Sequence, residues 1–115
     1  NSGYPFIHGN SDTAIIVEDV VSALTLSKFC TGIALLGTNL LQSHIDVLKK
    51  YKKVGIALDK DASKKAVKIL DDLALNMNAK FLLLEEDIKE MLDEDIKKLV
   101  DKVNKKAWGW MNDTY

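Results

Sequence analysis

Short runs of small and β-branched apolar residues alternate along this chain with longer amphipathic segments. In the longer segments, apolar residues recur every three to four positions, which is the spacing of one face of a helix. Such an alternation is typical of βαβ units, in which helices cover a largely parallel sheet. The sequence therefore predicts a three-layer α/β fold with about four mostly parallel strands flanked by helices. The predicted strands lie at residues 13–18, 32–36, 54–58 and 81–84, and the predicted helices at residues 19–29, 40–51, 62–73 and 93–106.

The length of 115 residues suits one globular domain with a modest core. The chain begins with Asn1 and continues through Ser2, Gly3, Tyr4 and Pro5, a composition typical of a connector. We therefore expect residues 1–12 to connect the domain to the rest of a longer polypeptide. The domain itself is predicted to span residues 13–107, and residues 108–115 to form a C-terminal tail.

Composition excludes several classes of protein. A net charge of −1 argues against a generally basic nucleic-acid binder. All 16 basic side chains are lysines, so contacts to phosphate would be point-charge contacts without guanidinium forks. The single cysteine, Cys30, excludes an internal disulfide and a multi-cysteine zinc site. No apolar stretch approaches the roughly 20 residues that cross a bilayer, and no signal-peptide pattern is present. We expect a cytoplasmic protein without a membrane partner.

Acidic residues close two of the predicted strands. Glu18 follows the first run, and Asp59 and Asp61 follow the run at residues 54–58. If these two strands are parallel neighbours, the three carboxylates emerge at the carboxyl edge of the sheet, where open α/β sheets bind ligands. Clustered carboxylates repel one another unless a cation joins them. A metal site is the functional interpretation, and helix capping is the structural one, since acids commonly cap helices at such junctions.

Several segments in this order carry a resemblance to a known family. Residues 15–18 (Ile-Ile-Val-Glu), 36–40 (Leu-Gly-Thr-Asn-Leu) and 58–61 (Leu-Asp-Lys-Asp) resemble the TOPRIM domain of primases, topoisomerases and some nucleases. The element around Gly37 and Thr38 is similar to that of bacterial and phage primases and primase-helicases. Residues 87–91 (Asp-Ile-Lys-Glu-Met) are similar to the primase segment Asp-Pro-Lys-Asp-Met. The resemblance covers about residues 13–100.

The resemblance implies a Rossmann-like fold and a DNA primase that makes RNA primers by Mg²⁺-dependent nucleotidyl transfer, with Mn²⁺ as a substitute. Asp59 and Asp61 would hold the metal, and Glu18 would join them or move a proton. The implied partners are a single-stranded DNA template, nucleoside triphosphates and a replicative helicase. The isolated segment is expected to be weakly active or inactive, because the template-gripping lobe is missing from these residues. Beside the site we expect lysines that bind phosphate at Lys60, Lys64 and Lys65, and further lining residues at Asp19, Ser22, Gly37, Thr38 and Asp87.

The chain departs from the family pattern in its first motif. Where the family writes Glu-Gly-x-x-Asp, this chain has Glu18, Asp19, Val20, Val21 and Ser22, so the glycine and the second acid are missing. Three alternatives therefore stay open. They are a TOPRIM nuclease or topoisomerase-type enzyme that cleaves DNA strands, a non-catalytic TOPRIM module that docks a helicase or nucleic acid, and a phosphotransferase of the haloacid-dehalogenase type with Asp59 as nucleophile.

Overall fold

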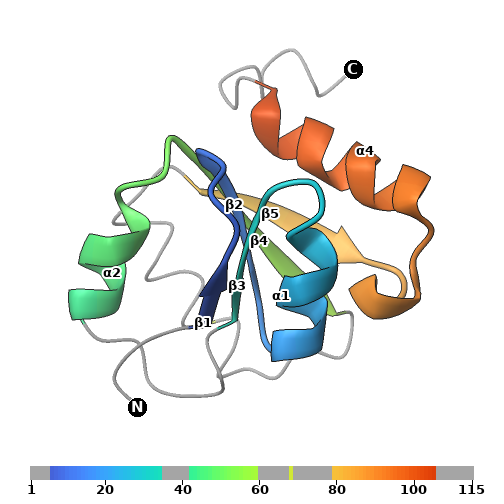
Figure 1. The fold of residues 1–115 in the computed structure, drawn as a ribbon, viewed down its shortest axis with the longest axis horizontal. Coiled ribbons are helices and arrows are strands. Elements are labelled where there is room, and N and C mark those ends of the chain that lie inside the picture. Colours follow the sequence, from blue (N-terminus) through green and yellow to red (C-terminus); the bar gives the residue numbers. More distant parts are fainter. Residues whose placement is uncertain (1–5, 35–41, 60–67, 69–78, 106–115) are drawn as a thin grey trace.

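Five strands form one mixed sheet in the order β1-β3-β2-β4-β5 (Figure 1). The structure, a computed structural model, describes residues 6–34, 42–59, 68 and 79–105. The pairs β2–β3, β2–β4 and β4–β5 are parallel, and β1 pairs antiparallel with β3. The predicted α/β class and its mostly parallel sheet are therefore confirmed. The strands are β1 Phe6–His8, β2 Thr13–Val17, β3 Thr31–Ala34, β4 Lys53–Asp59 and β5 Ala79–Leu84.

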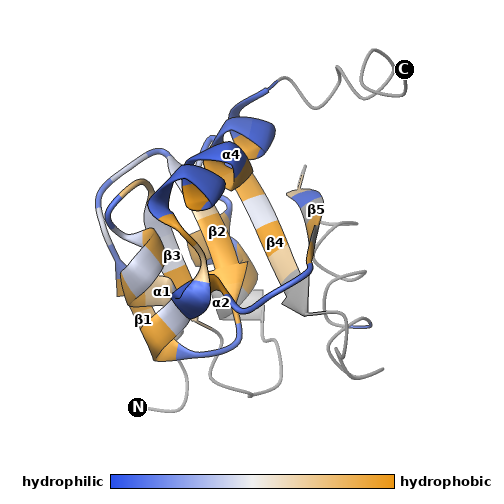
Figure 2. Cartoon of the chain, turned by 90° about the vertical axis from the view of Figure 1, so that its right-hand side faces the viewer, coloured by the Kyte–Doolittle hydropathy of each residue, from blue (hydrophilic) through white to orange (hydrophobic). Residues whose placement is uncertain are grey.

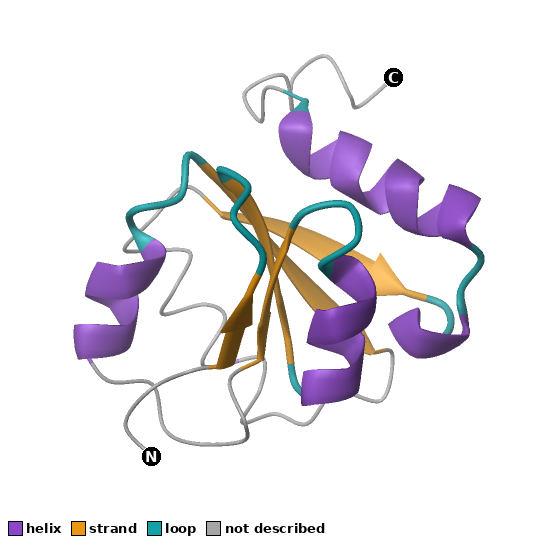
Figure 3. Cartoon of the chain, viewed as in Figure 1, coloured by secondary structure: helices purple, strands orange, loops and turns teal. Residues whose placement is uncertain are grey.

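Helices cover both faces of the sheet and complete the three predicted layers (Figures 1 and 3). On one face, α1 (Val20–Leu26) and α4 (Asp93–Asn104) pack against the strands, together with the short 3₁₀ helix η1 (Ile88–Glu90). On the other face, α2 (Gln42–Leu48) packs through Ile45 and Leu48. None of the helices in these ranges is long and apolar enough to cross a membrane.

The central strand β2 divides its side chains between two cores. All five of its residues are buried, as expected for a parallel strand with helices on both sides. Ile15 and Val17 contribute to the core beneath α1 and α4, whereas Ala14 and Ile16 contribute to the core beneath α2. This alternation follows from the two-residue period of a strand. Figure 2 shows the same pattern in colour, with mostly hydrophobic strands behind an α4 whose visible surface is mostly hydrophilic.

Glycines allow two helices to approach the sheet closely. A Cβ atom at Gly32 in β3 would lie 2.0 Å from the carbonyl oxygen of Ala23 in α1, so the two backbones are in direct contact. At Gly55 in β4, a Cβ atom would lie 2.5 Å from Cγ2 of Val103 in α4. The first contact involves rigid backbone and the second involves a side chain. The position of α1 therefore depends on the absence of a side chain at Gly32.

The predicted helix boundaries extend too far. Helix α1 ends at Leu26, not at residue 29, because a tight turn follows it in which the amides of Phe29 and Cys30 donate to the carbonyl of Leu26. Helix α2 ends at Leu48 and not at residue 51, and α4 ends at Asn104 and not at residue 106. Strands β4 and β5 are longer than predicted. The helix predicted at 62–73 lies outside the described residues, except for Lys68, and so does the predicted tail at 108–115.

Strand β1 was not predicted, because residues 1–12 were interpreted as a connector. Three residues are too few to display the alternation that identifies a strand. In the structure, Phe6 lies opposite Ala34 and His8 lies opposite Gly32 in the antiparallel ladder. The pairing satisfies the backbone hydrogen-bonding groups along one side of β3, which would otherwise be an open sheet edge.

Candidate functional site

The carboxyl ends of β2, β4 and β5 meet at one edge of the sheet, because these three strands are parallel neighbours. The chain leaves β2 through α1 toward β3 on one side, and it returns through α2 to β4 on the other side. The space between β2 and β4 is therefore a topological switch point, the place where open α/β sheets bind ligands. The prediction that these two strands run side by side in the same direction is confirmed.

This arrangement places two of the predicted acidic positions on neighbouring strands. Glu18 directly follows Val17, the last residue of β2, and its side chain is exposed. Asp59 is the last residue of β4, opposite Leu84 of β5 in the ladder, and its side chain lies outside the described part. The structure thus brings the two backbone positions to the same sheet edge. The other predicted site residues outside the described part are Gly37, Thr38, Lys60, Asp61, Lys64 and Lys65.

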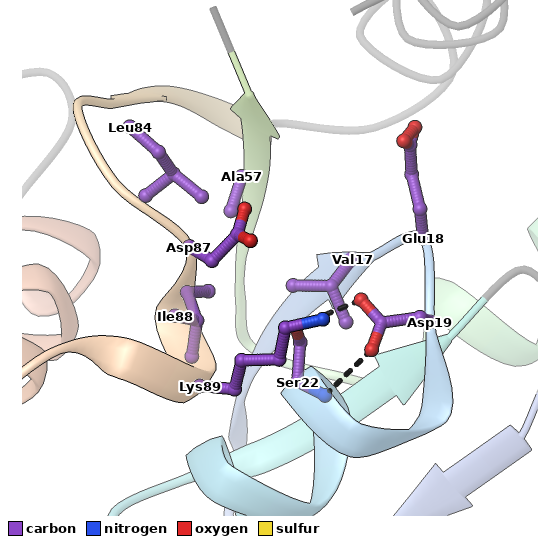
Figure 4. Close-up of a pocket in the computed structure, with 9 residues that line it drawn as sticks. All are labelled: Val17, Glu18, Asp19, Ser22, Ala57, Leu84, Asp87, Ile88 and Lys89. Atoms are coloured by element: carbon purple, nitrogen blue, oxygen red, sulfur yellow. Dashed lines mark hydrogen bonds between the residues drawn. The ribbon is translucent and has the colours of Figure 1, made fainter.

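An open pocket of about 270 Å³ lies at this edge (Figure 4). Its apolar wall comes from the strand ends and from η1, and its polar wall comes from the residues that follow β2 and β5. The lining residues are Val17, Glu18, Asp19, Ser22, Ala57, Leu84, Asp87, Ile88 and Lys89. Four of the predicted site residues, Glu18, Asp19, Ser22 and Asp87, therefore do share one pocket.

Asp19 caps helix α1. Its backbone is extended, and its Oδ2 atom accepts a hydrogen bond of 3.1 Å from the backbone amide of Ser22. The Ser22 hydroxyl donates to the second oxygen, Oδ1, at 2.8 Å. Ser22 is buried with 6% of its surface exposed, so its hydroxyl needs this partner. Both carboxylate oxygens of Asp19 are thus already bonded within the helix cap (Figure 4).

The segment after β5 holds two charged residues on either side of a buried anchor. Ile88 is 1% exposed and packs into the core beneath α1 and α4. The amides of Glu90 and Met91 donate to the carbonyls of Asp87 and Ile88, at 2.9 and 3.0 Å, and close the η1 turn. Asp87 and Lys89, both exposed, flank the anchor and line the pocket. The carboxylate of Asp87 has no hydrogen bond to the turn that it opens.

Lys89 was not among the predicted site residues. The prediction placed phosphate-binding lysines at positions 60, 64 and 65, next to the Asp-x-Asp pair. The available signal was the similarity of residues 87–91 to a primase segment that also contains a lysine at the third position. The burial of Ile88 explains how that lysine reaches the pocket. This burial is a property of the folded chain that the sequence alone does not reveal.

A family model described as Toprim-like matches residues 15–100, which is most of the chain and includes every described pocket residue. The chain belongs to the Toprim-like family. No match was found among curated proteins or among solved structures. The family identification supports the coarser part of the predicted function, a metal-binding module of enzymes that act on nucleic acids.

The acidic residues of this Toprim-like domain suit a magnesium ion in their chemistry. Mg²⁺ prefers hard oxygen ligands and is commonly held by one or two carboxylates together with water and substrate phosphates. Glu18 and Asp59 stand at the ends of neighbouring parallel strands, and Asp61 follows two residues later. Within the described ranges, no group of three or more histidine, cysteine or acidic side chains is close enough to hold a metal ion. That Glu18, Asp59 and Asp61 hold a metal together stays a prediction.

Other residues with metal-binding chemistry lie away from the pocket of the Toprim-like domain. Cys30 is buried in the core, and burial raises the pKa of its thiol to about 12, so the thiol stays protonated at neutral pH. His8 belongs to β1, where its ring stacks on Phe6. Neither residue is a pocket-lining residue. Both have structural surroundings that account for their positions without a ligand.

Proposed function

We propose that this Toprim-like domain is the catalytic-core segment of a DNA primase, which makes RNA primers on single-stranded DNA by nucleotidyl transfer. One observation carries the choice of primase. The segment of residues 87–91, which resembles a primase motif, forms the η1 turn at the same pocket as Glu18. Glu18, from the general TOPRIM element, and Asp87 and Lys89, from the primase-like element, therefore line one pocket although they are far apart in sequence.

The proposed roles follow from the position of each residue. Asp59 and Asp61 hold a divalent cation, Mg²⁺ or Mn²⁺, and Glu18 either joins them or accepts the proton of the attacking hydroxyl. When bound, the cation would neutralise charge on the triphosphate, align the attacking 3′-hydroxyl and stabilise the departing pyrophosphate. Lys60, Lys64 and Lys65 bind phosphate. Asp19 and Ser22 fix the start of α1 and thereby the backbone that presents Glu18.

One observation favours a second candidate, a Toprim-like module that docks a helicase or nucleic acid without catalysis. Ser22 stands where the family pattern has its second acid, and both oxygens of Asp19 are bonded in the helix cap. Of the two acids after β2, only Glu18 has a carboxylate that is not held in the helix cap. Fewer carboxylates lower the affinity of a site for a divalent cation. A nuclease with the same fold is a third candidate, and an assay must distinguish it from the primase and the docking module.

The products of one assay distinguish these functions. The full product of the gene that encodes this chain is incubated with single-stranded DNA, the four ribonucleoside triphosphates and Mg²⁺, and the nucleic acids are separated by size. A primase is expected to yield short RNA oligomers that require both template and nucleotides. Shortened or nicked DNA would instead identify a nuclease or a strand-cleaving enzyme. Binding of DNA or helicase with neither product would identify a docking module and contradict the proposal.

A further inference from the structure

Lys89 is the only cation among the described residues that line the pocket, where its neighbours include Glu18, Asp19 and Asp87. Its side chain extends from η1 toward Asp19 and Ser22 (Figure 4). Within the described part of the chain, its ammonium forms no ion pair with these acids. Since the ammonium forms no such ion pair, its three N–H donors are available to a ligand in the pocket.

The position of Lys89 is set by the fold. Ile88, the adjacent residue, is 1% exposed in the core, and the η1 turn is closed by two backbone hydrogen bonds. A side chain on such a turn starts from a fixed backbone, so part of the entropy of positioning its charged end is already lost on folding. Lys97 and Lys98 on α4 are exposed lysines that do not line the pocket. Among the described residues, Lys89 is thus the lysine that the fold directs to the pocket.

We propose that Lys89 is a positioning residue that binds the phosphate chain of the incoming nucleoside triphosphate. This inference rests on the proposed function and extends it, because that function gives phosphate binding only to Lys60, Lys64 and Lys65. Lys89 and Glu18 line the same pocket, so a phosphate chain bound by the ammonium would lie at the sheet edge where β2 and β4 end. A lysine is suited to this role as a point charge with three donors, in a chain that has no arginine.

A purely electrostatic role is the competing explanation. An ammonium near three carboxylates reduces their mutual repulsion, which needs no substrate. The two roles differ in which ligand binds differently after Lys89 is replaced. Removing a charge that only neutralises the acids would strengthen the binding of a divalent cation and leave pyrophosphate binding unchanged. Removing a phosphate contact weakens the binding of pyrophosphate and nucleotide, whatever happens to the cation.

The test compares the Kd values of three probes for the full gene product and its variants at constant free Mg²⁺. The probes are inorganic pyrophosphate, a ribonucleoside triphosphate and single-stranded DNA. Lys89→Gln is expected to weaken pyrophosphate and triphosphate binding about five- to tenfold, the size of one charge-assisted contact at a partly exposed site. Lys89→Arg keeps the charge and should restore most of the affinity. Lys98→Gln, the matched control on α4, should bind all three probes like the native protein.

The outcomes separate this inference from the proposed function. Native protein that binds triphosphate and makes primers, together with an unaffected Lys89→Gln variant, would overturn the role of Lys89 alone. A weakened affinity for single-stranded DNA without a change for pyrophosphate would also overturn it, since the contact would then belong to the template backbone. In steady-state assays, KM for nucleotide should rise with little change in kcat. Native protein that binds neither pyrophosphate nor triphosphate would contradict both proposals.

Discussion

Replacing Glu18 by glutamine is expected to lower the rate of the primer synthesis that we propose by about a hundredfold or more, the usual contribution of a positioned acid or base. The residue directly follows the central strand and stands at the switch point between β2 and β4. Glutamine preserves the size of the side chain but removes its negative charge, so it neither accepts a proton at neutral pH nor neutralises a cation. The measurement is the initial rate of primer synthesis by the full gene product.

The fold of the Glu18→Gln variant should be unaffected, because the side chain is exposed. Its free energy of unfolding in urea should agree with that of the native protein within about 0.5 kcal/mol. Glu86→Gln is the matched control, since Glu86 is an exposed acid after β5 that does not line the pocket. Full activity of Glu18→Gln, or an equal loss in Glu86→Gln, would remove Glu18 from the mechanism.

Of the glycine-to-alanine substitutions in the described sheet, Gly32→Ala is expected to destabilise the protein most. The new Cβ atom would lie 2.0 Å from the carbonyl oxygen and 2.7 Å from the carbonyl carbon of Ala23, far inside van der Waals contact. Since these are backbone atoms of α1, the clash can be relieved only by moving the helix away from β3. We expect a loss of about 3 kcal/mol or more in the free energy of unfolding. Urea denaturation followed by circular dichroism measures it.

Gly55→Ala provides the comparison for Gly32→Ala. Its Cβ atom would first meet Cγ2 of Val103 at 2.5 Å, which is a side-chain atom and can shift at lower cost. The loss of stability should therefore be smaller for Gly55→Ala than for Gly32→Ala. A larger loss of stability for Gly55→Ala than for Gly32→Ala would show that α1 tolerates displacement. The packing of α1 on β3 would then not fix the backbone at Glu18 and Asp19.

The sequence predicts the fold well where hydrophobic patterns are long. Strand β2 has five consecutive buried residues, and the helix after it begins at Val20, within one residue of the predicted start. Strand β1 is not predicted, because three residues are too few to show the two-residue alternation of a strand. Its pairing with β3 depends on contacts between residues that are distant in sequence. The end of α1 is also set by tertiary structure, since Cys30 and Thr31 must enter the buried part of the sheet.

The candidate site is predicted less completely than the fold. Glu18, Asp19, Ser22 and Asp87 share a pocket because parallel strands bring their carboxyl ends together, a consequence of topology that the sequence pattern reveals. The hydrogen bonds between Asp19 and Ser22 are not visible in the pattern, which only shows a missing acid. The role of Lys89 depends on the burial of its neighbour, and burial is decided by packing.

The central claim is that the acids at the carboxyl edge of β2 and β4 form one divalent-cation site. Thermal unfolding with and without Mn²⁺ or Mg²⁺ tests it most directly, because a ligand that binds only the folded state stabilises that state. At about 100 times its Kd the cation adds about 2.7 kcal/mol, which raises the Tm of a domain of this size by roughly 10 °C. We predict this rise for the native protein and for Glu85→Gln/Glu86→Gln, and its absence in Asp59→Asn/Asp61→Asn. An equal rise in Asp59→Asn/Asp61→Asn would contradict the account.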